Sequence, residues 1–421
     1  MVRELKHTEI GDIPIDWEIQ TFEETFKILS NNTLSRDNLN NRAGAVKNIH
    51  YGDILTQFSE VLKCNEVEIP YINNMSLLSS STQLVQDGDL IIADTAEDET
   101  VGKVTEVQGL GNGKLVAGLH TIPCRVKKGD FAPGWLGYYM NSHMYHDQII
   151  PFITGIKVSS ISKSAIAETL IVIPPVDEQK QIVNILSQID ILIQEEKKVA
   201  EKIMAAKRGC LSKMFPKDGE CIPEMRLPGF CGDWEQRKLG DVVGVYDGVH
   251  QTPDYQASGI MFLSVENIAT LISDKFISED AFKRDYKVYP EKGDILMTRI
   301  GDVGTTNVVE TTEKLAFYVS LALLKPIDVD SYFLSNAMQS PLFKKGLKNR
   351  TLVTAIPQKI NKDEIGKIEV FLPQNKNEQE QIGAYFKNLD HLITLHQRKC
   401  EKYIGIKSAL ISTLISAKKQ T

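Results

Sequence analysis

The spacing of apolar residues between positions 177 and 214 predicts one long amphipathic helix. Apolar residues recur there in alternating steps of four and three, which is the a/d spacing of a coiled coil. The steps persist over more than four heptads once Glu196 and Lys207 are counted as polar members of the seam. Because a lone surface helix shows a wider and shorter apolar stripe, this helix requires a partner. The apolar seam positions are Ile182, Leu186, Ile189, Ile193, Ala200, Ile203, Cys210 and Met214.

The same pattern returns 200 residues later in the chain. Glu378-Gln379 repeats Glu178-Gln179, and the seam lysine Lys207 recurs as Lys407. Unrelated amphipathic helices rarely share both register and polar interruption, so we interpret the chain as an internal duplication. The second seam consists of Ile382, Phe386, Leu389, Ile393, His396, Cys400, Tyr403, Lys407, Leu410 and Leu414.

The segments that precede the two helices also repeat. A short apolar strand closed by proline precedes each helix, at Ile171–Pro174 and at Val370–Pro373, since proline cannot continue a ladder. Short strands separated by polar loops favour mixed α/β globules without regular strand–helix alternation. We therefore expect an α+β protein with two similar globules and two long helices. The predicted boundaries are 1–175, first globule; 176–215, central helix; 216–233, linker; 234–374, second globule; and 375–421, C-terminal helix.

Composition indicates an ordinary soluble protein and adds no cofactor motif. Charged residues make up 24% and hydrophobic residues 42% of 421 residues, which allows two or three domains. No apolar run approaches the ~20 residues of a membrane span, and the start lacks a signal-peptide core, so we expect a cytoplasmic protein without a membrane. The six cysteines lack zinc-ligand spacing, and we expect no metal site.

Charge and motif searches bear on what the protein does. The formal net charge of −7 argues against a protein that grips nucleic acid unaided, but it is compatible with a reader whose partners supply phosphate contacts. The glycine-rich segment Gly109–Leu115 is one residue short of a phosphate loop. Hydrolase, metalloprotease and kinase signatures are absent from the sequence, so we predict no catalytic residues.

Polar loops of the second globule are candidates for DNA contacts. Gln and His can pair with base edges, Arg can bind guanine with two hydrogen bonds, and Asn can do so with adenine. For each residue taken alone, a solvated turn is the more common explanation. The candidates are His250, Gln251, Thr252 and Tyr255 in one loop, Arg299, Thr305, Thr306 and Asn307 in a second, and Gln358 and Lys359 as phosphate contacts.

Two further groups of candidates are weaker or concern protein partners. The first globule offers analogous loop residues, and both long helices carry apolar residues outside the seam. Extra apolar positions widen the stripe and predict that a third helix packs there. The loop candidates are Lys47, His50, Tyr51, Lys157, Ser159 and Ser160, and the docking candidates are Ile191, Leu192, Leu392 and Leu395.

With these features in order, the sequence resembles the specificity subunit of Type I restriction-modification enzymes. The resemblance covers nearly the whole chain, and it is specific because the main motifs occur twice in the same order. The motifs that carry it are Thr8–Trp17, Lys213–Gly219, Arg226–Trp234, Arg237–Gly240 and the helix starts Glu178-Gln179 and Glu378-Gln379.

The resemblance implies a fold and a function. Each globule would be a target recognition domain that reads one half of a bipartite, asymmetric sequence in double-stranded DNA. The helices would form an antiparallel coiled coil with pseudo-two-fold symmetry and serve as a spacer. Two methylation subunits would bring S-adenosylmethionine and adenine-N6 methylation, and a restriction and translocase subunit would bring ATP and Mg²⁺. The chain itself would be non-catalytic and bind none of these cofactors.

One departure and two alternatives accompany the resemblance. Where such domains often show an Arg-x-Gly strand, the first globule has Asp94–Asp98. A coiled-coil scaffold that holds two binding modules without a DNA role is one alternative. A self-sufficient enzyme is the other, and it would require a cofactor or metal motif.

Overall fold

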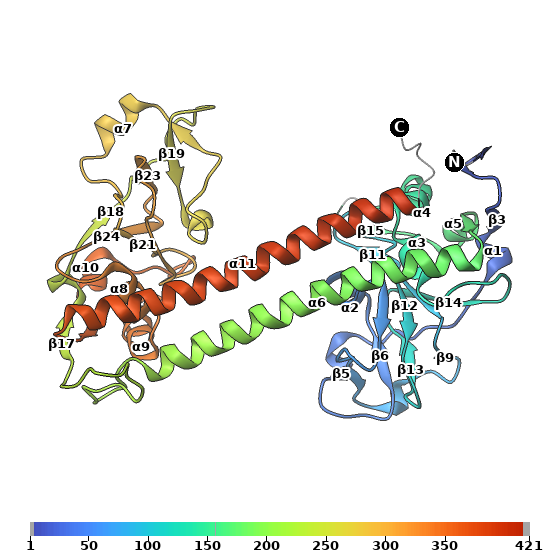
Figure 1. The fold of residues 1–421 in the computed structure, drawn as a ribbon, viewed down its shortest axis with the longest axis horizontal. Helices are drawn as coiled ribbons and strands as arrows, with labels where there is room; N and C mark the ends of the chain where they lie inside the picture. Colours follow the sequence, from blue (N-terminus) through green and yellow to red (C-terminus); the bar gives the residue numbers. More distant parts are fainter. Residues whose placement is uncertain (1–3, 156, 416–421) are drawn as a thin grey trace. The chain divides into compact units, whose positions relative to one another are not determined.

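The structure is a computed structural model that describes residues 4–155 and 157–415, and it divides into two compact units (Figure 1). Unit 1 contains the described residues up to Glu195 and those from Lys399 onward, and unit 2 is Glu196–Arg398. Two long helices, α6 (Val176–Lys213) and α11 (Lys376–Leu414), each contribute one half to each unit. The predicted fold class of two mixed α/β domains with paired long helices is confirmed.

The contact-based division differs from the predicted domain limits. Helix α6 ends at Lys213, two residues before the predicted end of the central helix. The division cuts both long helices near their middles instead of at their ends, because each half packs on its own globule. Of the predicted C-terminal helix 375–421, residues 416–421 lie outside the described residues.

Unit 1 is built on two five-stranded sheets with short helices around them. The first sheet is ordered β4 (Phe26–Ile28), β14 (Thr121–Val126), β10 (Leu90–Ala93), β12 (Val104–Gln108) and β7 (Val61–Lys63). The second is ordered β5 (Leu39–Asn40), β8 (Tyr71–Ile72), β6 (Lys47–Ile49), β13 (Leu115–Ala117) and β9 (Leu84–Val85). Three two-stranded pairs are β1 (Leu5–Thr8) with β2 (Gly11–Pro14), β3 (Glu18–Thr21) with β16 (Leu170–Ile173), and β11 (Thr95–Ala96) with β15 (Ser159–Ser160). The helices are α1 (Phe22–Thr25), α2 (Tyr51–Thr56), α3 (Trp135–Met140), α4 (His143–Ile149) and α5 (Lys163–Ala167).

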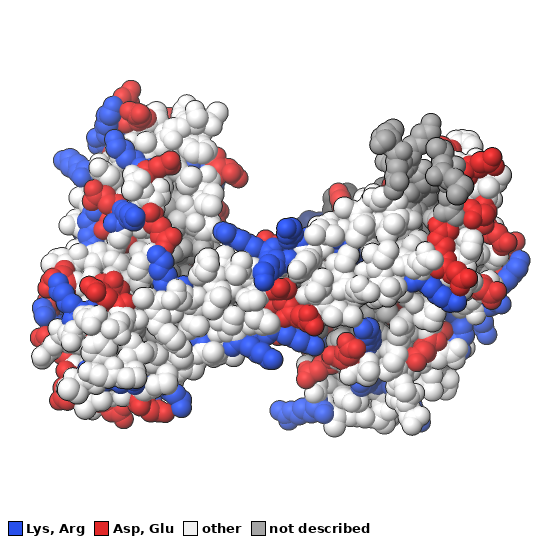
Figure 2. Space-filling model, in the orientation of Figure 1, with Lys and Arg blue, Asp and Glu red and all other residues white. Residues whose placement is uncertain are grey.

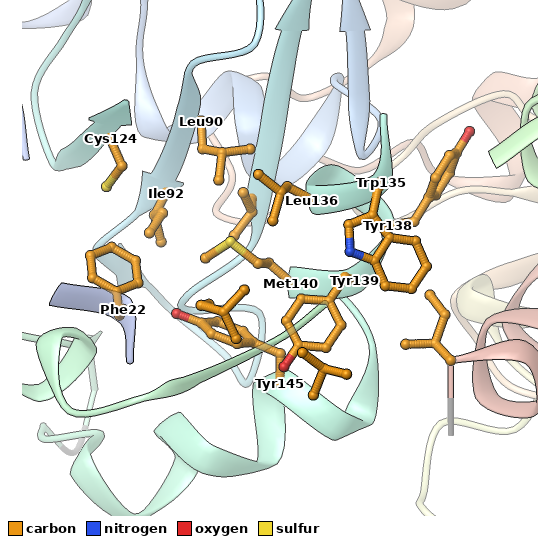
Figure 3. Close-up of a cluster of buried hydrophobic side chains, with 14 of the residues drawn as sticks. Phe22, Leu90, Ile92, Cys124, Trp135, Leu136, Tyr138, Tyr139, Met140 and Tyr145 are labelled. Atoms are coloured by element: carbon orange, nitrogen blue, oxygen red, sulfur yellow. The ribbon is translucent and has the colours of Figure 1, made fainter. Parts of the chain in front are cut away.

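The largest core of unit 1 lies between the first sheet and helix α3 (Figure 3). All six residues of α3 are buried, and the rings of Trp135 and Tyr139 stack with centroids 5.9 Å apart. Leu90 and Ile92 from β10 and Cys124 from β14 face this aromatic cluster. Burial of large apolar side chains is the main stabilising term in folding, so unit 1 has a core of its own.

Unit 2 repeats this plan with fewer strands. One sheet is ordered β18 (Val243–Asp247), β24 (Leu321–Pro326), β21 (Ile295–Thr298) and β22 (Thr306–Val308). The other is ordered β20 (Phe276–Ile277), β19 (Ile260–Leu263) and β23 (Leu315–Phe317), and β17 (Glu235–Lys238) pairs with β25 (Glu369–Leu372). The helices are α7 (Glu279–Asp285), α8 (Ser331–Ala337), α9 (Pro341–Arg350) and α10 (Lys362–Gly366).

The strand pairings confirm the internal duplication. In both units an antiparallel pair forms the centre of the main sheet, β10 with β14 and β21 with β24. In both units the second sheet contains a parallel pair, β6 with β13 and β19 with β23. In both units an early strand pairs with the strand before the long helix, β3 with β16 and β17 with β25.

The repeated Glu-Gln motif anchors each long helix to its globule. Gln179 accepts a hydrogen bond from the backbone N–H of Ala132 (2.8 Å) and donates one to the Pro174 carbonyl (2.7 Å). Gln379 makes the same two bonds, from the N–H of Asp330 (3.2 Å) and to the Pro373 carbonyl (2.9 Å). A buried side-chain amide with both ends satisfied fixes the direction in which the helix leaves the globule.

The preceding glutamate has a different donor in each unit. Glu178 accepts from the Trp17 indole (3.0 Å), whereas Glu378 accepts two bonds from Arg226 (2.7 and 2.8 Å). Both donors belong to motifs that also carried the sequence resemblance. These motifs are therefore structural connections between helix start and globule.

The polar seam positions pair across the two long helices within each unit. In unit 1, Lys407 contacts Asp190 (2.6 Å) and Glu60. In unit 2, Lys207 contacts Asp390 (2.6 Å), two positions related to the first pair by the 200-residue repeat. Each half of α6 thus lies beside the opposite half of α11, so the helices run antiparallel (Figure 1). Glu196 and His396, themselves repeat partners, contact one another in unit 2.

Candidate nucleic-acid interface

At the end of the central strand of the main sheet, both units have the same pair of backbone hydrogen bonds, which we call the backbone frame. The residue after β10 is Asp94, whose N–H donates to the His120 carbonyl (3.1 Å). The residue after β21 is Arg299, whose N–H donates to the Ser320 carbonyl (2.9 Å). Asp94 and Arg299 therefore occupy equivalent positions with opposite charges. Each of their carbonyls accepts from an isoleucine N–H, Ile161 at 2.9 Å and Ile360 at 3.0 Å.

Arg299 does not present its side chain as predicted. It is 7% exposed, its Nη1 contacts the Asp247 carboxylate, and its Nε donates to the Ile360 carbonyl (3.2 Å). A buried, paired guanidinium cannot offer its two-pronged edge to guanine. We therefore correct the expectation: Arg299 joins β18 and β21 to the segment that precedes α10.

The side chains of Asn307 and Thr306 also make hydrogen bonds within unit 2. The Asn307 amide nitrogen donates to the carbonyls of Ile268 (2.9 Å) and Ala269 (3.1 Å). The Thr306 hydroxyl shares a hydrogen bond with the Ser335 hydroxyl (2.9 Å). A two-bond contact of Asn with adenine needs the amide donor, which is already used here. The prediction of a base contact is therefore corrected for Asn307, whereas Thr306, which is half-buried, stays a prediction.

Thr305 and Gln358 line one open cavity of about 400 Å³ in unit 2. The Gln358 amide donates to the Gly301 carbonyl (3.0 Å), and the Gly301 N–H donates back to the Gln358 carbonyl (2.9 Å). Two loops that are distant in sequence are thereby joined. Lys344 and Lys348 of α9 line the same cavity, so polar and cationic groups suited to a phosphate backbone meet there. Lys359 is exposed beside Gln358.

The loop between β18 and β19 keeps its candidates at the surface. His250, Gln251 and Thr252 are exposed. Tyr255 is 44% exposed, and its ring packs edge-on against Phe262 with centroids 5.6 Å apart. These four residues stay predictions for base or sugar contacts.

His50 of unit 1 has a structural role. It is 8% exposed, and its Nδ1 accepts a hydrogen bond from the Gly52 N–H (3.3 Å) at the start of α2. Burial, and then the nearby charge of Arg36, lowers the pKa of His50 below its usual value. A buried N-cap side chain is not available to a base edge, and we correct that prediction.

Of the other candidates of unit 1, Tyr51 and residues 157–160 lie near the end of the main sheet, whereas Lys47 lies in strand β6 of the second sheet. Tyr51 is half-buried between His50 and His120, and Lys47 is half-buried with its Nζ 5.8 Å from the Tyr71 ring centroid. Ser159–Ser160 forms strand β15, which pairs with Thr95–Ala96. The exposed Lys157 precedes that strand. Strand pairing thus brings residues 95–96 beside residues 159–160, although the two segments are distant in sequence.

His120 is a surface candidate that sequence reasoning missed. Its Nδ1 lies 3.4 Å from Asp94 Oδ1 and 3.2 Å from Thr95 Oγ1, and its side chain is 46% exposed. In the 200-residue repeat His120 corresponds to Ser320. Each of these residues directly precedes one of the equivalent strands, β14 or β24. That alignment of the two halves is the signal that could have identified it.

Two of the four docking candidates, Leu192 and Leu392, form part of an exposed apolar stripe on the long helices. Leu192 and Leu392, repeat partners, are each 39% exposed, and Ile191 and Leu395 are exposed as well. Ile185, Leu192 and Val199 follow one another at intervals of seven on α6, as do Tyr385 and Leu392 on α11. Each residue of this stripe lies one position before a seam residue, as Leu192 does before Ile193, and the stripe therefore widens the apolar face of each helix.

Charged side chains of both signs are mixed at the visible surface of both units (Figure 2). Within residues 4–155 and 157–415, no three His, Cys, Asp or Glu side chains are grouped to hold a metal ion. No helix in that same part of the chain is long and apolar enough to cross a membrane.

The fold is that of two-domain subunits of type I restriction–modification systems. The S subunit from M. genitalium matches with a TM-score of 0.58 at 14% identity, covering 100% of both chains. A chain from a structure that addresses complex assembly and conformational transition of the type I system matches with a TM-score of 0.54 at 16% identity. That match covers 96% of this chain and 98% of the other. At such identities the likeness concerns the fold.

The chain belongs to the Type I restriction modification DNA specificity domain family, whose model matches twice, at residues 14–205 and 232–402. The MjaX type I restriction enzyme specificity subunit of Methanocaldococcus jannaschii is 24% identical, over 98% of this chain and 96% of that protein. The MjaVIII specificity subunit of the same organism is 25% identical over 63% and 65% of the two chains. The resemblance found in the sequence is confirmed, and a scaffold without a DNA role is not favoured.

Proposed function

We propose that each unit reads one half of a bipartite, asymmetric sequence in double-stranded DNA. The observation that carries this proposal is the backbone frame shared by the two units, which holds different side chains. Asp94 and His120 in unit 1 correspond to Arg299 and Ser320 in unit 2. Equivalent frames present their loops in equivalent ways, and the exposed side chains of those loops, which differ between the units, would select different bases. Two such readers on one chain give two unlike half-sites.

We further propose that two methylation subunits dock on the exposed stripes of the long helices. Leu192 belongs to unit 1 and its repeat partner Leu392 to unit 2, so each unit carries one equivalent apolar site. Exposed apolar residues at heptad spacing suit packing by another helix. One site in each unit supports two copies of the same partner. Restriction and translocase subunits would join this complex.

The chain acts in this proposal as a non-catalytic subunit. S-adenosylmethionine would bind to the methylation subunits, and ATP and Mg²⁺ to the restriction and translocase subunits. The net charge of −7 supports a shared grip on DNA, because a chain with an acidic balance gains from partners that contact phosphates. Lys344 and Lys348 would add local phosphate contacts in unit 2.

Methylation mapping tests this function directly. Cells that express the full chain with its methylation subunits should carry N6-methyladenine at one motif with two specified halves and an unspecified spacer. Cells that express the methylation subunits without this chain are the control and should lack that motif. A continuous motif, or an unchanged methylation pattern, would contradict the proposal.

A further inference from the structure

We propose that His120 recognises an exocyclic amino group of a base in the major groove, adenine N6 or cytosine N4, and that Asp94 positions its ring. This inference rests on the proposed function, because it assigns a specificity-determining residue to the half-site that unit 1 reads. It is carried by the backbone conformation of His120, by the contacts of its ring and by its exposure.

The backbone of His120 is held in an unfavourable conformation. Its φ is +54°, in the left-handed region that non-glycine residues rarely adopt. Among the described non-glycine residues, only Leu271 and Asp328 share a positive φ, and the repeat partner Ser320 does not. Such conformations cost free energy, and they cluster at active sites and ligand-binding sites. The duplication shows that the frame itself does not require this conformation.

The contacts of the His120 ring define which nitrogen carries the proton. The Thr95 hydroxyl donates to Asp94 Oδ1 (2.8 Å), so the Thr95 oxygen retains a lone pair for the His120 Nδ1–H at 3.2 Å. Asp94 Oδ1 lies 3.4 Å from the same nitrogen and adds a negative charge on that side. We assign the proton to Nδ1 from this network, which leaves Nε2 as a hydrogen-bond acceptor.

The contacts around the His120 ring hold it in one orientation, so that Nε2 is a fixed hydrogen-bond acceptor at the surface. The Tyr51 ring meets the His120 ring edge-on, with centroids 5.3 Å apart. With Nδ1 held by Asp94 and Thr95 and one side held by Tyr51, the partly exposed imidazole loses little further freedom on binding.

An acceptor at the surface selects among bases by their major-groove edges. Adenine N6 and cytosine N4 are donors, whereas guanine and thymine present only acceptors at the corresponding positions. His120 should therefore exclude guanine and thymine at one position of the half-site. A good two-bond base contact contributes about fivefold to a hundredfold discrimination against a wrong base, and the single bond to His120 should contribute toward the lower end of that range.

The test removes the imidazole without disturbing the backbone. In His120→Gly the positive φ suits glycine, so the variant should fold. The full chain carrying this change, expressed with its methylation subunits, should methylate a motif in which one position of one half becomes degenerate. The preference lost at that position should be for adenine or cytosine, and the wild-type motif identifies which. His7→Ala is the matched control, since His7 also directs Nδ1 to a carboxylate, Asp12 at 2.8 Å.

The outcomes separate this inference from the proposed function. The half-site read by unit 2 should stay unchanged in every variant and serves as an internal standard. An unchanged motif in His120→Gly, or a uniform loss of methylation without a change of base preference, would overturn the role of His120. Failure of the wild-type chain to direct any bipartite motif would instead reject the proposed function.

Asp94 is a positioning residue and needs a test of its own. Asp94→Asn keeps an oxygen that accepts from the Thr95 hydroxyl, whose own oxygen accepts from His120 Nδ1–H, and should retain the base preference. Asp94→Ala removes the acceptor, and preference at the same position should fall by about tenfold, within the range for one base contact. Equal behaviour of the two variants would show that Asp94 does not orient the ring.

Discussion

At the scale of single residues, burial decides which polar side chains belong to the frame and which face solvent. Arg299 and His50 are both largely buried, and each satisfies backbone or carboxylate groups of its own unit. His120 and Gln358 sit on the same kind of loop but keep exposed surface. Since a buried polar group must be hydrogen-bonded, residues such as Arg299 contribute stability and the exposed ones remain for recognition.

Arg299→Ala should destabilise unit 2 without changing its base preference. The change leaves the Asp247 carboxylate without its cation, and we expect a loss of at most about 3 kcal/mol, the lower end for a broken buried pair. The value is at the lower end because the Asp247 side chain is 29% exposed. Denaturant unfolding measures the loss. Arg284→Ala, which breaks the exposed pair with Asp285 (2.7 Å), is the control and should leave the stability close to that of the wild type, because solvent screens an exposed ion pair. A change of target sequence in Arg299→Ala would restore it as a base reader.

His50 should make the stability of unit 1 depend on pH. Its pKa in the folded chain is lowered, so the unfolded chain binds its proton more readily. The free energy of unfolding should therefore fall as pH decreases through the unfolded value of about 6.5, and this contribution should be constant above it. His50→Asn keeps an N-cap acceptor and should flatten the dependence between about pH 5 and 7. Identical pH profiles for both proteins, measured by thermal unfolding, would exclude this role.

At the scale of elements, the long helices combine a seam, a set of buried charges and an exposed stripe. Lys407 on α11 lies over the Tyr138 ring at 5.3 Å and contacts two carboxylates of unit 1. Its repeat partner Lys207 contacts one carboxylate in a more exposed place. The two seam lysines are equivalent in sequence, but Lys407 is more deeply buried than Lys207. The loss of folding stability on breaking an ion pair increases with the burial of the charges that remain.

Lys407→Met should destabilise the protein more than Lys207→Met. In the first variant Glu60 and Asp190 are left together without a cation at partly buried positions, and we expect a loss of about 3–5 kcal/mol. The second variant leaves Asp390, which is half exposed, and should cost about 1 kcal/mol or less. Chemical denaturation of both variants measures the difference, and equal losses would contradict the account based on desolvation.

The exposed stripe should carry partner docking. Leu192→Asp combined with Leu392→Asp places a charge in each apolar site, and the double variant should fail to co-purify with methylation subunits. Because both side chains are partly exposed already, circular dichroism and thermal unfolding should remain close to wild type. The matched control is Gln188→Asp with Asn388→Asp, an exposed repeat pair on the same helices, which should assemble normally. Normal assembly of the leucine variant would reject this surface.

At the scale of the whole molecule, the duplication gives two units that each have their own cores. The clusters around Trp135 and around Ile49 lie within unit 1, and those around Trp234 and around Phe317 lie within unit 2. Separate cores let one reader diverge without unfolding the other. The Glu-Gln anchors stay the same while the loops differ, which is the pattern expected for exchangeable recognition modules.

Exchange of the second globule should therefore change one half-site only. Replacing residues 234–373 with the corresponding segment of another specificity subunit keeps Gln379 and the long helices. Methylation mapping should show a new sequence in one half of the motif and the original sequence in the other. Changes in both halves would show that the units do not recognise DNA independently.

The duplication, the long helices and their polar seam positions can all be predicted from the amino-acid sequence alone. These features are local or periodic: a heptad spacing follows from helix geometry, and a repeat of Lys207 as Lys407 needs no knowledge of packing. The exposed positions Leu192 and Leu392 could likewise be predicted, because they fall beside the seam in both helices.

Which loop residues are free to recognise DNA depends on contacts that exist only in the folded protein. Arg299 is paired with Asp247 and Ile360, which are 52 and 61 residues away, so its burial could not be inferred from its own loop. His120 gains its place from Asp94 and Thr95 across neighbouring strands, and its left-handed backbone has no signature in sequence. Contacts between residues that are distant in sequence determine which polar side chains are removed from water. A side chain that is buried and paired in this way has a structural role, whereas one that stays exposed is available for recognition.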